Sequence, residues 1–203
     1  MILKAAILGI IEGLTEFLPV SSTGHLIIAN TFVPLEKDFE ALFNIVIQFG
    51  AILAVVFCYR KELLPEKLFS FLRPCFYRSE LTDEAEREEG RKFLSLWGKI
   101  IIAFIPAAVI GVFIDDILEK YLFNAQSVSI ALIAGAVLMF AADKKVDREA
   151  LESVHSLSVR QAVAIGFFQC LAMWPGMSRS ASTIAGGLFS GLSRSAAAEF
   201  SFF

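Results

Sequence analysis

Cysteine is scarce in this 203-residue sequence and badly placed for chemistry. Its three cysteines, Cys58, Cys75 and Cys170, are odd in number, lie far apart and form no C-x-x-C pair. This pattern supports neither a disulfide framework nor a zinc site, so we interpret them as small hydrophobic residues. An excess of positive charge is also lacking, because 18 Lys and Arg stand against 21 Asp and Glu. Nothing therefore indicates nucleic-acid binding, which requires a clustered basic face.

A cleavable signal sequence is not evident either. Met1–Lys4 lead directly into an apolar stretch, without a basic n-region or a small-residue cleavage site. We therefore expect the N-terminus to be part of the mature fold. What the sequence has in abundance is apolar residues: 56% are hydrophobic, 20 are Phe, and the mean hydropathy is +0.66. Soluble domains are only about 45–50% apolar, so this composition predicts an integral membrane protein.

Polar groups are concentrated in one otherwise apolar stretch, EGLTEFLPVSSTGH at residues 12–25. It holds two carboxylates, several hydroxyls and an imidazole. A charged side chain at membrane depth costs about 2.5–3.5 kcal/mol on insertion scales, so such residues usually face a cavity, a partner or a substrate. The stretch therefore predicts a functional site.

Proline interrupts the first apolar segment. Ala5–Leu18 favours a helix, and Pro19 ends or kinks it because proline lacks a backbone donor and clashes with the preceding turn. From residue 2 to 18 such a helix covers about 25 Å, less than the bilayer core of about 30 Å. A second short helix, Ser22 to about Phe32, follows a polar turn. We predict a re-entrant hairpin over residues 1–33, which survives only where it is buried in protein or lines a cavity.

Three further apolar stretches are candidate membrane spans. They are Phe39–Tyr59, which Asn44 and Gln48 interrupt, Phe93–Ile114, and Val128–Ala142, which spans if it extends back to Leu122.

The loops between these spans predict their orientation. The connections 60–92 and 143–160 are rich in Lys and Arg, whereas the turn Asp115–Ser127 has Lys120 as its one basic residue. By the positive-inside rule the two basic connections are cytoplasmic and the turn is external. The span that begins at Phe39 then enters from outside. The first hairpin is therefore expected to enter the membrane from the outer face.

A second polar region, residues 166–183, repeats the order of the first: short helix, proline, Ser-rich turn and short helix. A shift of 157 residues aligns Ala5 with Ala162, Gly9 with Gly166, Glu12 with Gln169, Leu14 with Leu171 and Ser21 with Ser178, with Pro19 and Pro175 one position out of step. Because the second copy follows a cytoplasmic connection, the pair forms an inverted-topology repeat whose broken helices meet near the midplane.

These observations predict one all-α, polytopic integral membrane domain over residues 1–203. Repeat 1 covers about 1–114, and repeat 2 covers about 157–203 onward, with its re-entrant hairpin at 161–192. The two hairpins are expected to meet tip to tip near the membrane midplane. Their contents are complementary, because the first carries the acids and the imidazole and the second carries Arg179 among hydroxyls.

The acids of the first hairpin are suited to a cation. Glu12 and Glu16 lie four residues apart on one helix face, where like charges are unfavourable unless a cation or an arginine lies between them. Carboxylates with substrate phosphates commonly hold Mg²⁺.

The remaining polar residues are suited to an anion and to phosphoryl transfer. Ser21 and Ser178 can each cap the following half-helix, whose N-terminal amides attract anions. Arg179 offers a planar fork that matches phosphate oxygens. Ser22 and His25, three residues apart, share a face, so a serine nucleophile beside an acid or base is geometrically feasible.

Residues 12–25 and WPGMSRS at 174–180 closely resemble the two signature motifs of the undecaprenyl-diphosphate phosphatase family linked to bacitracin resistance. The resemblance extends over the whole chain in motif order and spacing. It implies an enzyme of the bacterial plasma membrane that removes the terminal phosphate from undecaprenyl (C55-isoprenyl) diphosphate, regenerating the lipid carrier for cell-wall polymers. The predicted orientation places its site on the outer side.

The resemblance also implies roles for individual residues. It suggests Ser22 as the nucleophile, Glu12 and Glu16 as ligands of a divalent cation (Mg²⁺ or Ca²⁺) or as proton carriers, and Arg179 as the diphosphate holder. His25 is either the base for Ser22 or the acid for the leaving group, and both roles stay open. We expect further substrate contacts from Ser21, Thr23, Gly24, Gly176, Ser178, Ser180 and Thr183.

Two other functions share parts of this pattern. A polyprenyl-phosphate flippase or transporter has the same inverted-repeat architecture, but a carrier does not need the Ser22, His25 and paired-glutamate set. A phosphohistidine lipid phosphatase fails because no second histidine follows Arg179. We leave open whether the chain forms a homodimer. Members of the resembled family usually continue through further helices, whereas this sequence stops at Phe203, in an apolar run that begins near Ala196.

Overall fold

The computed structural model describes residues 1–60, 84–122, 124–146 and 150–203. Within those ranges the regular structure is helical, apart from one isolated β-bridge between Leu151 and Leu192. The α-helices are α1 (Ile2–Thr15), α2 (Ser22–Phe32), α3 (Lys37–Cys58), α6 (Glu84–Leu122), α7 (Ala125–Asp143), α8 (Val159–Gln169), α9 (Arg179–Phe189) and α10 (Arg194–Phe202), and the short 3₁₀ turns are η2 (Val154–Ser156) and η3 (Cys170–Met173).

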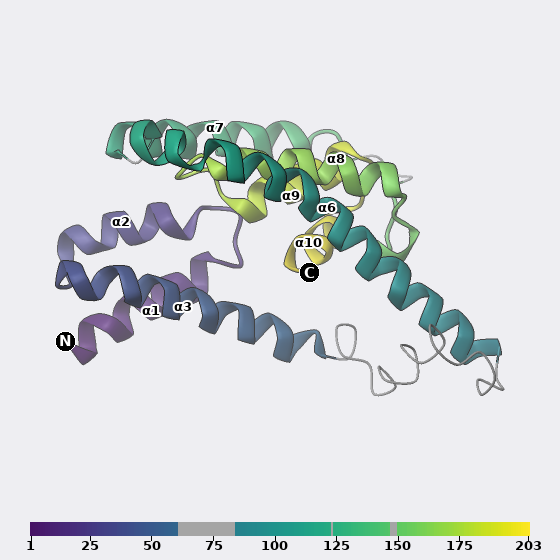
Figure 1. Cartoon of the computed structure of the whole chain (residues 1–203), viewed down its shortest axis with the longest axis horizontal. Coiled ribbons are helices and arrows are strands. Elements are labelled where there is room, and N and C mark those ends of the chain that lie inside the picture. The colour runs from purple at the N-terminus through teal and green to yellow at the C-terminus, as the bar shows by residue number, and fades with distance from the viewer. Residues whose placement is uncertain (61–83, 123, 147–149) are drawn as a thin grey trace.

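The helices form two groups (Figure 1). In the first group α1 packs against both α2 and α3. In the second, α9 lies at the centre and packs against α7, α8 and α10, while α6 covers α8. Every residue of α9 from Ser180 to Leu188 is buried, so this helix is the core of its group. The groups meet where the turn after α1 approaches the turn before α9.

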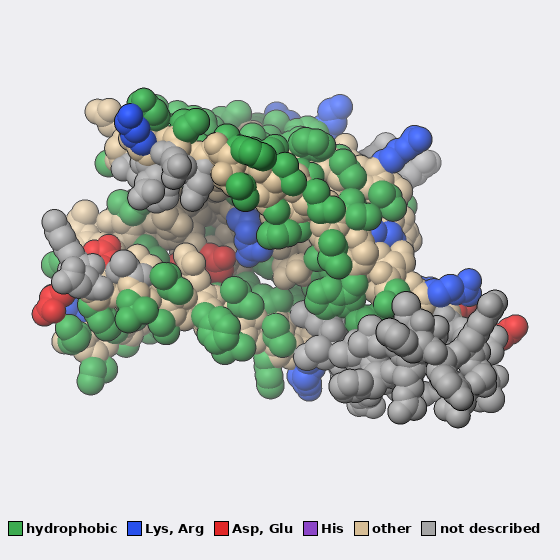
Figure 2. Space-filling model, viewed as in Figure 1, with side chains coloured by type: hydrophobic (Ala, Val, Ile, Leu, Met, Phe, Trp, Pro, Cys, Tyr) green, Lys and Arg blue, Asp and Glu red, His purple; other side chains and the backbone are tan. Residues whose placement is uncertain are grey.

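The described residues form the all-helical fold that was predicted, with long apolar helices of the kind a membrane protein needs. Among the described residues, two helical stretches are long and apolar enough to cross a membrane, Gly90–Ile114 and Ala125–Asp143. Leu42–Cys58 and Val159–Met173 are shorter apolar helices. Large apolar side chains are exposed along α3, α6 and α7, and Figure 2 shows them covering much of one face. Such a surface is suited to lipid rather than to water.

Glycines allow the central helices of the second group to approach closely. A Cβ added at Gly166 of α8 would lie 2.3 Å from the carbonyl oxygen of Ala103 in α6. A Cβ added at Gly186 of α9 would lie 2.7 Å from Cβ of Phe168 in α8. Both distances are shorter than real contacts allow, so glycine sets the spacing of α6, α8 and α9. This packing fixes the position of the first residues of α9.

The bounds predicted for the turn Asp115–Ser127 were wrong. Helix α6 continues to Leu122, and α7 begins at Ala125. The prediction relied on charged residues, but charge does not end a helix, and no Gly or Pro occurs between 115 and 122 to do so. Asn124 then caps α7 by accepting a hydrogen bond from the backbone of Ser127. The span predicted at Phe93–Ile114 agrees with the apolar stretch Gly90–Ile114, but the helix that contains it begins earlier, at Glu84.

The first helix ends earlier than predicted. Helix α1 stops at Thr15, before Leu18 and Pro19. The residue that precedes a proline is disfavoured in helical geometry, so the chain leaves the helix before reaching it. Residues 16–20 form a turn in which Leu18 N–H bonds the carbonyl of Thr15. This turn places Glu16 just beyond the end of α1.

Candidate active site

The turn between α1 and α2 is held by Ser21. This residue has φ +65°, in the left-handed region that residues other than glycine rarely adopt. Its hydroxyl accepts a hydrogen bond from Gly24 N–H at 3.2 Å, so it caps α2 as expected. Its carbonyl bonds Nδ1 of His25 at 2.8 Å. A strained residue held by several local bonds is common at functional sites, and here it fixes the start of α2.

The turn before α9 has the same kind of support. Ser178 caps α9 by accepting a hydrogen bond from Ala181 N–H at 3.2 Å, as expected. Gly176 has φ +94°, and a Cβ there would lie 2.6 Å from the carbonyl of Val128 in α7. Only glycine suits that backbone and that spacing. Trp174 Nε1 donates to Ser127 Oγ at 2.7 Å, which ties the turn to the first residues of α7.

The two turns touch directly. Ser180 Oγ donates to the carbonyl of Leu18 at 3.3 Å. Arg179 Nη2 lies 3.4 Å from Glu16 Oε1. The arginine side chain is 52% exposed and the glutamate 25%, so this ion pair is open to solvent on one side and weakly held. Residues far apart in the sequence are therefore brought into one site.

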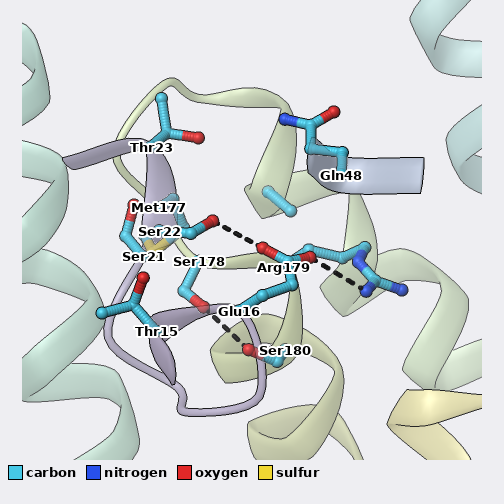
Figure 3. A pocket seen from close by; sticks show the side chains of 11 residues that line it. Thr15, Glu16, Ser21, Ser22, Thr23, Gln48, Met177, Ser178, Arg179 and Ser180 are labelled. Carbon is cyan, nitrogen blue, oxygen red and sulfur yellow. Dashed lines mark hydrogen bonds and ion pairs between the residues drawn. The ribbon is translucent and has the colours of Figure 1, made fainter. Parts of the chain in front are cut away.

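Glu16 connects the two sides of the site. Ser22 Oγ donates a hydrogen bond of 2.5 Å to Glu16 Oε2, the oxygen that does not face Arg179 (Figure 3). The carboxylate thus has a hydroxyl on one oxygen and a guanidinium on the other. A short bond to an ionised acceptor is strong, and it places a proton acceptor directly on the serine hydroxyl. Ser22 is the serine of the first hairpin that contacts an acid.

A pocket of about 220 Å³ opens around this contact. Figure 2 shows a hollow between the two groups of helices in which acidic and basic atoms are visible. The pocket takes its residues from both turns and from α3. It is lined by Thr15, Glu16, Ser21, Ser22, Thr23, Gln48, Ala172, Met177, Ser178, Arg179 and Ser180.

Five residues predicted for the site do not line this pocket. His25 is exposed and bonds the backbone of Ser21, so the structure does not pair it with Ser22. Glu12 is 1% exposed, and neither of its carboxylate oxygens has a hydrogen-bond partner among the described residues. Thr183 bonds Ser201 at 2.5 Å, inside the contact of α9 with α10. Gly24 and Gly176 shape the two turns instead.

Four lining residues were not among the predicted site residues: Thr15, Gln48, Ala172 and Met177. Gln48 carried a signal, since it interrupts an apolar stretch, but the sequence alone does not show where α3 presents it. Thr15 lies inside the first polar motif. Ala172 and Met177 are apolar, and nothing in their residue type points to a site.

The donor atoms around the pocket fit a hard cation. Glu16 offers a carboxylate, and Ser22 and Thr23 offer hydroxyl oxygens, the ligand type that Mg²⁺ and Ca²⁺ prefer. Within the described ranges no group of three or more His, Cys, Asp or Glu side chains lies together. The pocket therefore offers part of a coordination shell, which phosphate and water oxygens would complete.

The fold and the pocket together define a helical membrane protein with a polar site built from an acid, an arginine, hydroxyls and two helix N-termini. This set is suited to a phosphate-bearing ligand. Residues 5–203 match the model of the family described as bacitracin resistance protein BacA. The chain belongs to that family, which confirms the resemblance drawn from its two motifs.

Similar proteins agree with this membership. The undecaprenyl-diphosphatase of Clostridium tetani is 47% identical, over 100% of this chain and 69% of the relative. That of Thermoanaerobacter sp. is 47% identical, over 100% of this chain and 70% of the relative. That of Pseudomonas syringae pv. tomato is 46% identical, over 98% of this chain and 66% of the relative.

Proposed function

We propose that this chain hydrolyses undecaprenyl diphosphate to undecaprenyl phosphate and inorganic phosphate. Its relatives are undecaprenyl-diphosphatases at 47% identity over the whole of the chain. The observation that carries the proposal is the pocket in which Glu16 contacts both Ser22 and Arg179. The reaction recycles a lipid carrier for cell-wall synthesis, in agreement with a family named for bacitracin resistance.

Ser22 is the proposed nucleophile. Its Oγ attacks the terminal phosphorus while the Glu16 carboxylate, 2.5 Å away, takes the hydroxyl proton. The bond from that phosphorus to the bridging oxygen breaks, and undecaprenyl phosphate leaves. Water then hydrolyses the phosphoester on Ser22, which releases inorganic phosphate and restores the hydroxyl. Glu16 rather than His25 is therefore the base we propose for Ser22, and a role for His25 with the leaving group stays a prediction.

Arg179 and the helix N-termini are proposed to hold the diphosphate. In the free protein Arg179 contacts Glu16 through a 3.4 Å ion pair that is half exposed, so substrate oxygens can compete for the guanidinium. The capped first turns of α2 and α9 both begin at the pocket, at Ser22 and Arg179. Their backbone N–H groups carry partial positive charge. Charge that develops on the phosphoryl oxygens is stabilised by these backbone groups and by the guanidinium.

A divalent cation is proposed as cofactor, with Glu16 and the pocket hydroxyls as its protein ligands. When bound, it would neutralise charge on the diphosphate oxygens. Glu12, predicted as a second ligand, is buried, its carboxylate has no hydrogen-bond partner within the described part of the chain, and it does not line the pocket. Glu12 lies one helical turn before Glu16, in α1. We propose that it acts on the site through its charge and not as a ligand of the cation.

The membrane arrangement proposed from the sequence also belongs here. Helices α1 and α2, and α8 and α9, are proposed to be two re-entrant hairpins of inverted repeats over about 1–114 and 157–203. The contacts of Arg179 with Glu16 and of Ser180 with Leu18 support a meeting of their turns. We propose a single membrane domain in the bacterial plasma membrane, with the pocket open to the outer side. A homodimer stays a prediction.

Phosphate release tests the proposed function. The purified chain in detergent is given undecaprenyl diphosphate with Mg²⁺ or Ca²⁺, and then with a chelator. We expect release of inorganic phosphate with matching formation of undecaprenyl phosphate, and a loss of both when the cation is removed. A polyprenyl-phosphate carrier, the alternative function, would bind the lipid and leave the diphosphate intact. Intact lipid after incubation with folded protein and cation would overturn the proposal.

A further inference from the structure

Gln48 is the residue of the pocket that comes from outside both hairpins. It belongs to α3, whereas the other lining residues come from the ends and turns of the two hairpins. Figure 3 shows its amide at the edge of the pocket that lies away from Ser180, on the side of Thr23. The diphosphate site thus has a third wall, and this wall carries one amide.

The surroundings of Gln48 along α3 are apolar. Ile45, Val46, Phe49 and Ile52 are large exposed hydrophobic side chains on the same helix. Gln48 itself is exposed, and it is the residue of α3 that lines the pocket. Inside a membrane an amide without a polar partner costs several kcal/mol, which favours a position of this side chain at the pocket. The pocket supplies that environment. No hydrogen bond of the Gln48 side chain to another described residue is present, so its donors are free for a ligand.

A primary amide is suited to binding the phosphate oxygens of a diphosphate in this pocket. Two N–H donors can bond anionic phosphate oxygens without adding charge. The site already holds Arg179 and two helix N-termini as positive elements. A neutral donor on the third wall adds geometric selection for a group that is longer than one phosphate.

We infer that Gln48 is a substrate-binding residue whose side-chain Nε2 donates hydrogen bonds to the diphosphate group. The inference rests on the proposed function and adds to it a contact from α3. Because Gln48 touches neither Ser22 nor Glu16 through a hydrogen bond, it acts on the binding of the diphosphate rather than on the proton transfer. Loss of this contact therefore weakens the binding of the substrate and of the transition state by the same amount. KM rises as a result, and kcat stays nearly unchanged.

Three variants test this contact by steady-state phosphate release. Gln48→Leu removes the amide, and Gln48→Glu keeps its shape while replacing the donors by a negative charge. Asn44→Leu is the matched control, because it removes an amide one turn earlier on α3 at a position that does not line the pocket. We expect KM to rise by roughly 10- to 100-fold in both Gln48 variants, the range for a lost bond to a charged group. We expect kcat within about 3-fold of wild type.

Each outcome decides the inference. A wild-type KM in Gln48→Glu would overturn the donor role, and equal effects of Gln48→Leu and Asn44→Leu would overturn the contact. Thermal unfolding of each variant in detergent shows whether it is folded. If Gln48→Leu is not folded, the KM of Gln48→Glu decides the inference. Wild-type protein that releases no phosphate would instead contradict the proposed function, before any variant is compared.

Discussion

The carboxylate of Glu16 is shared by two partners that belong to different hairpins. Ser22 occupies one oxygen and Arg179 the other, at 2.5 and 3.4 Å. The serine bond is short and comes from a buried residue, whereas the arginine is half exposed. A diphosphate that enters the pocket can therefore draw Arg179 away while the contact of Glu16 with Ser22 persists. Of the two contacts of Glu16, the one with Ser22 is therefore the shorter and better buried, and the one with Arg179 is open to competition by a ligand.

Arg179→Lys tests the proposed role of the Arg179 guanidinium in holding the diphosphate. Lysine keeps the charge but loses the planar fork that bonds two phosphate oxygens at once. We expect kcat/KM to fall by about 10- to 100-fold, measured by phosphate release. Arg160→Lys, an exposed position outside the pocket, is the control and should behave as wild type. Equal activity of the two variants would mean that Arg179 does not hold the diphosphate.

The residues of the site were predictable where local sequence decides their position. Ser21 and Ser178 cap the helices that follow them, as their places after a turn predicted. Gln48 was not predicted as a site residue, because its position in the pocket depends on how α3 packs. His25 is three residues from Ser22, but Nδ1 of its ring bonds the backbone carbonyl of Ser21. Spacing along a helix shows which residues share a face, and it does not show which partner is nearer.

At the scale of elements, helix existence was easier to predict than helix ends. Apolar stretches correctly predicted α3, α6 and α7, because burial in lipid or protein requires them. The end of α6 was placed too early, since charge was taken as a sign of a turn. Close packing between α6 and α8 was not predictable, because it depends on a glycine that meets a backbone far away in the sequence.

Gly166→Ala tests that packing. The added Cβ would lie 2.3 Å from the carbonyl of Ala103, so α6 and α8 must separate and α9 loses its support. We expect the free energy of unfolding to fall by roughly 2–4 kcal/mol, within the range for core disruption, and the melting temperature to fall with it. The matched control is Gly98→Ala in α6, where nothing lies within 4 Å of an added Cβ. That variant should be neutral or slightly stabilising, and equal melting of both variants would contradict the packing argument.

At the scale of the whole molecule, the site lies between two groups of helices (Figure 1). Neither group contains a complete site, because Glu16 and Ser22 belong to one and Arg179 to the other. The sequence predicted that the two polar regions would meet, since each needs polar partners inside a membrane. It did not predict the third wall from α3. Contacts between distant segments follow from tertiary packing, which hydropathy and motif order do not determine.

Cysteine labelling tests the proposed orientation. In a chain whose three native cysteines are replaced, Thr23→Cys lies at the pocket and Lys145→Cys follows α7, and both positions are exposed. We expect a membrane-impermeant maleimide to label Thr23→Cys from the outer side of intact membranes and Lys145→Cys only after permeabilisation. The opposite pattern would reverse the proposed topology.

The Ser22→Ala variant tests the central claim most directly, because it removes one oxygen from the pocket and nothing else. Phosphate release and lipid binding are measured together in detergent with Mg²⁺, beside wild type and Ser129→Ala, an exposed position on α7 outside the pocket. The account predicts that Ser22→Ala binds undecaprenyl diphosphate and releases no phosphate, while Ser129→Ala behaves as wild type. Normal release by Ser22→Ala would contradict it, and would favour direct attack by water.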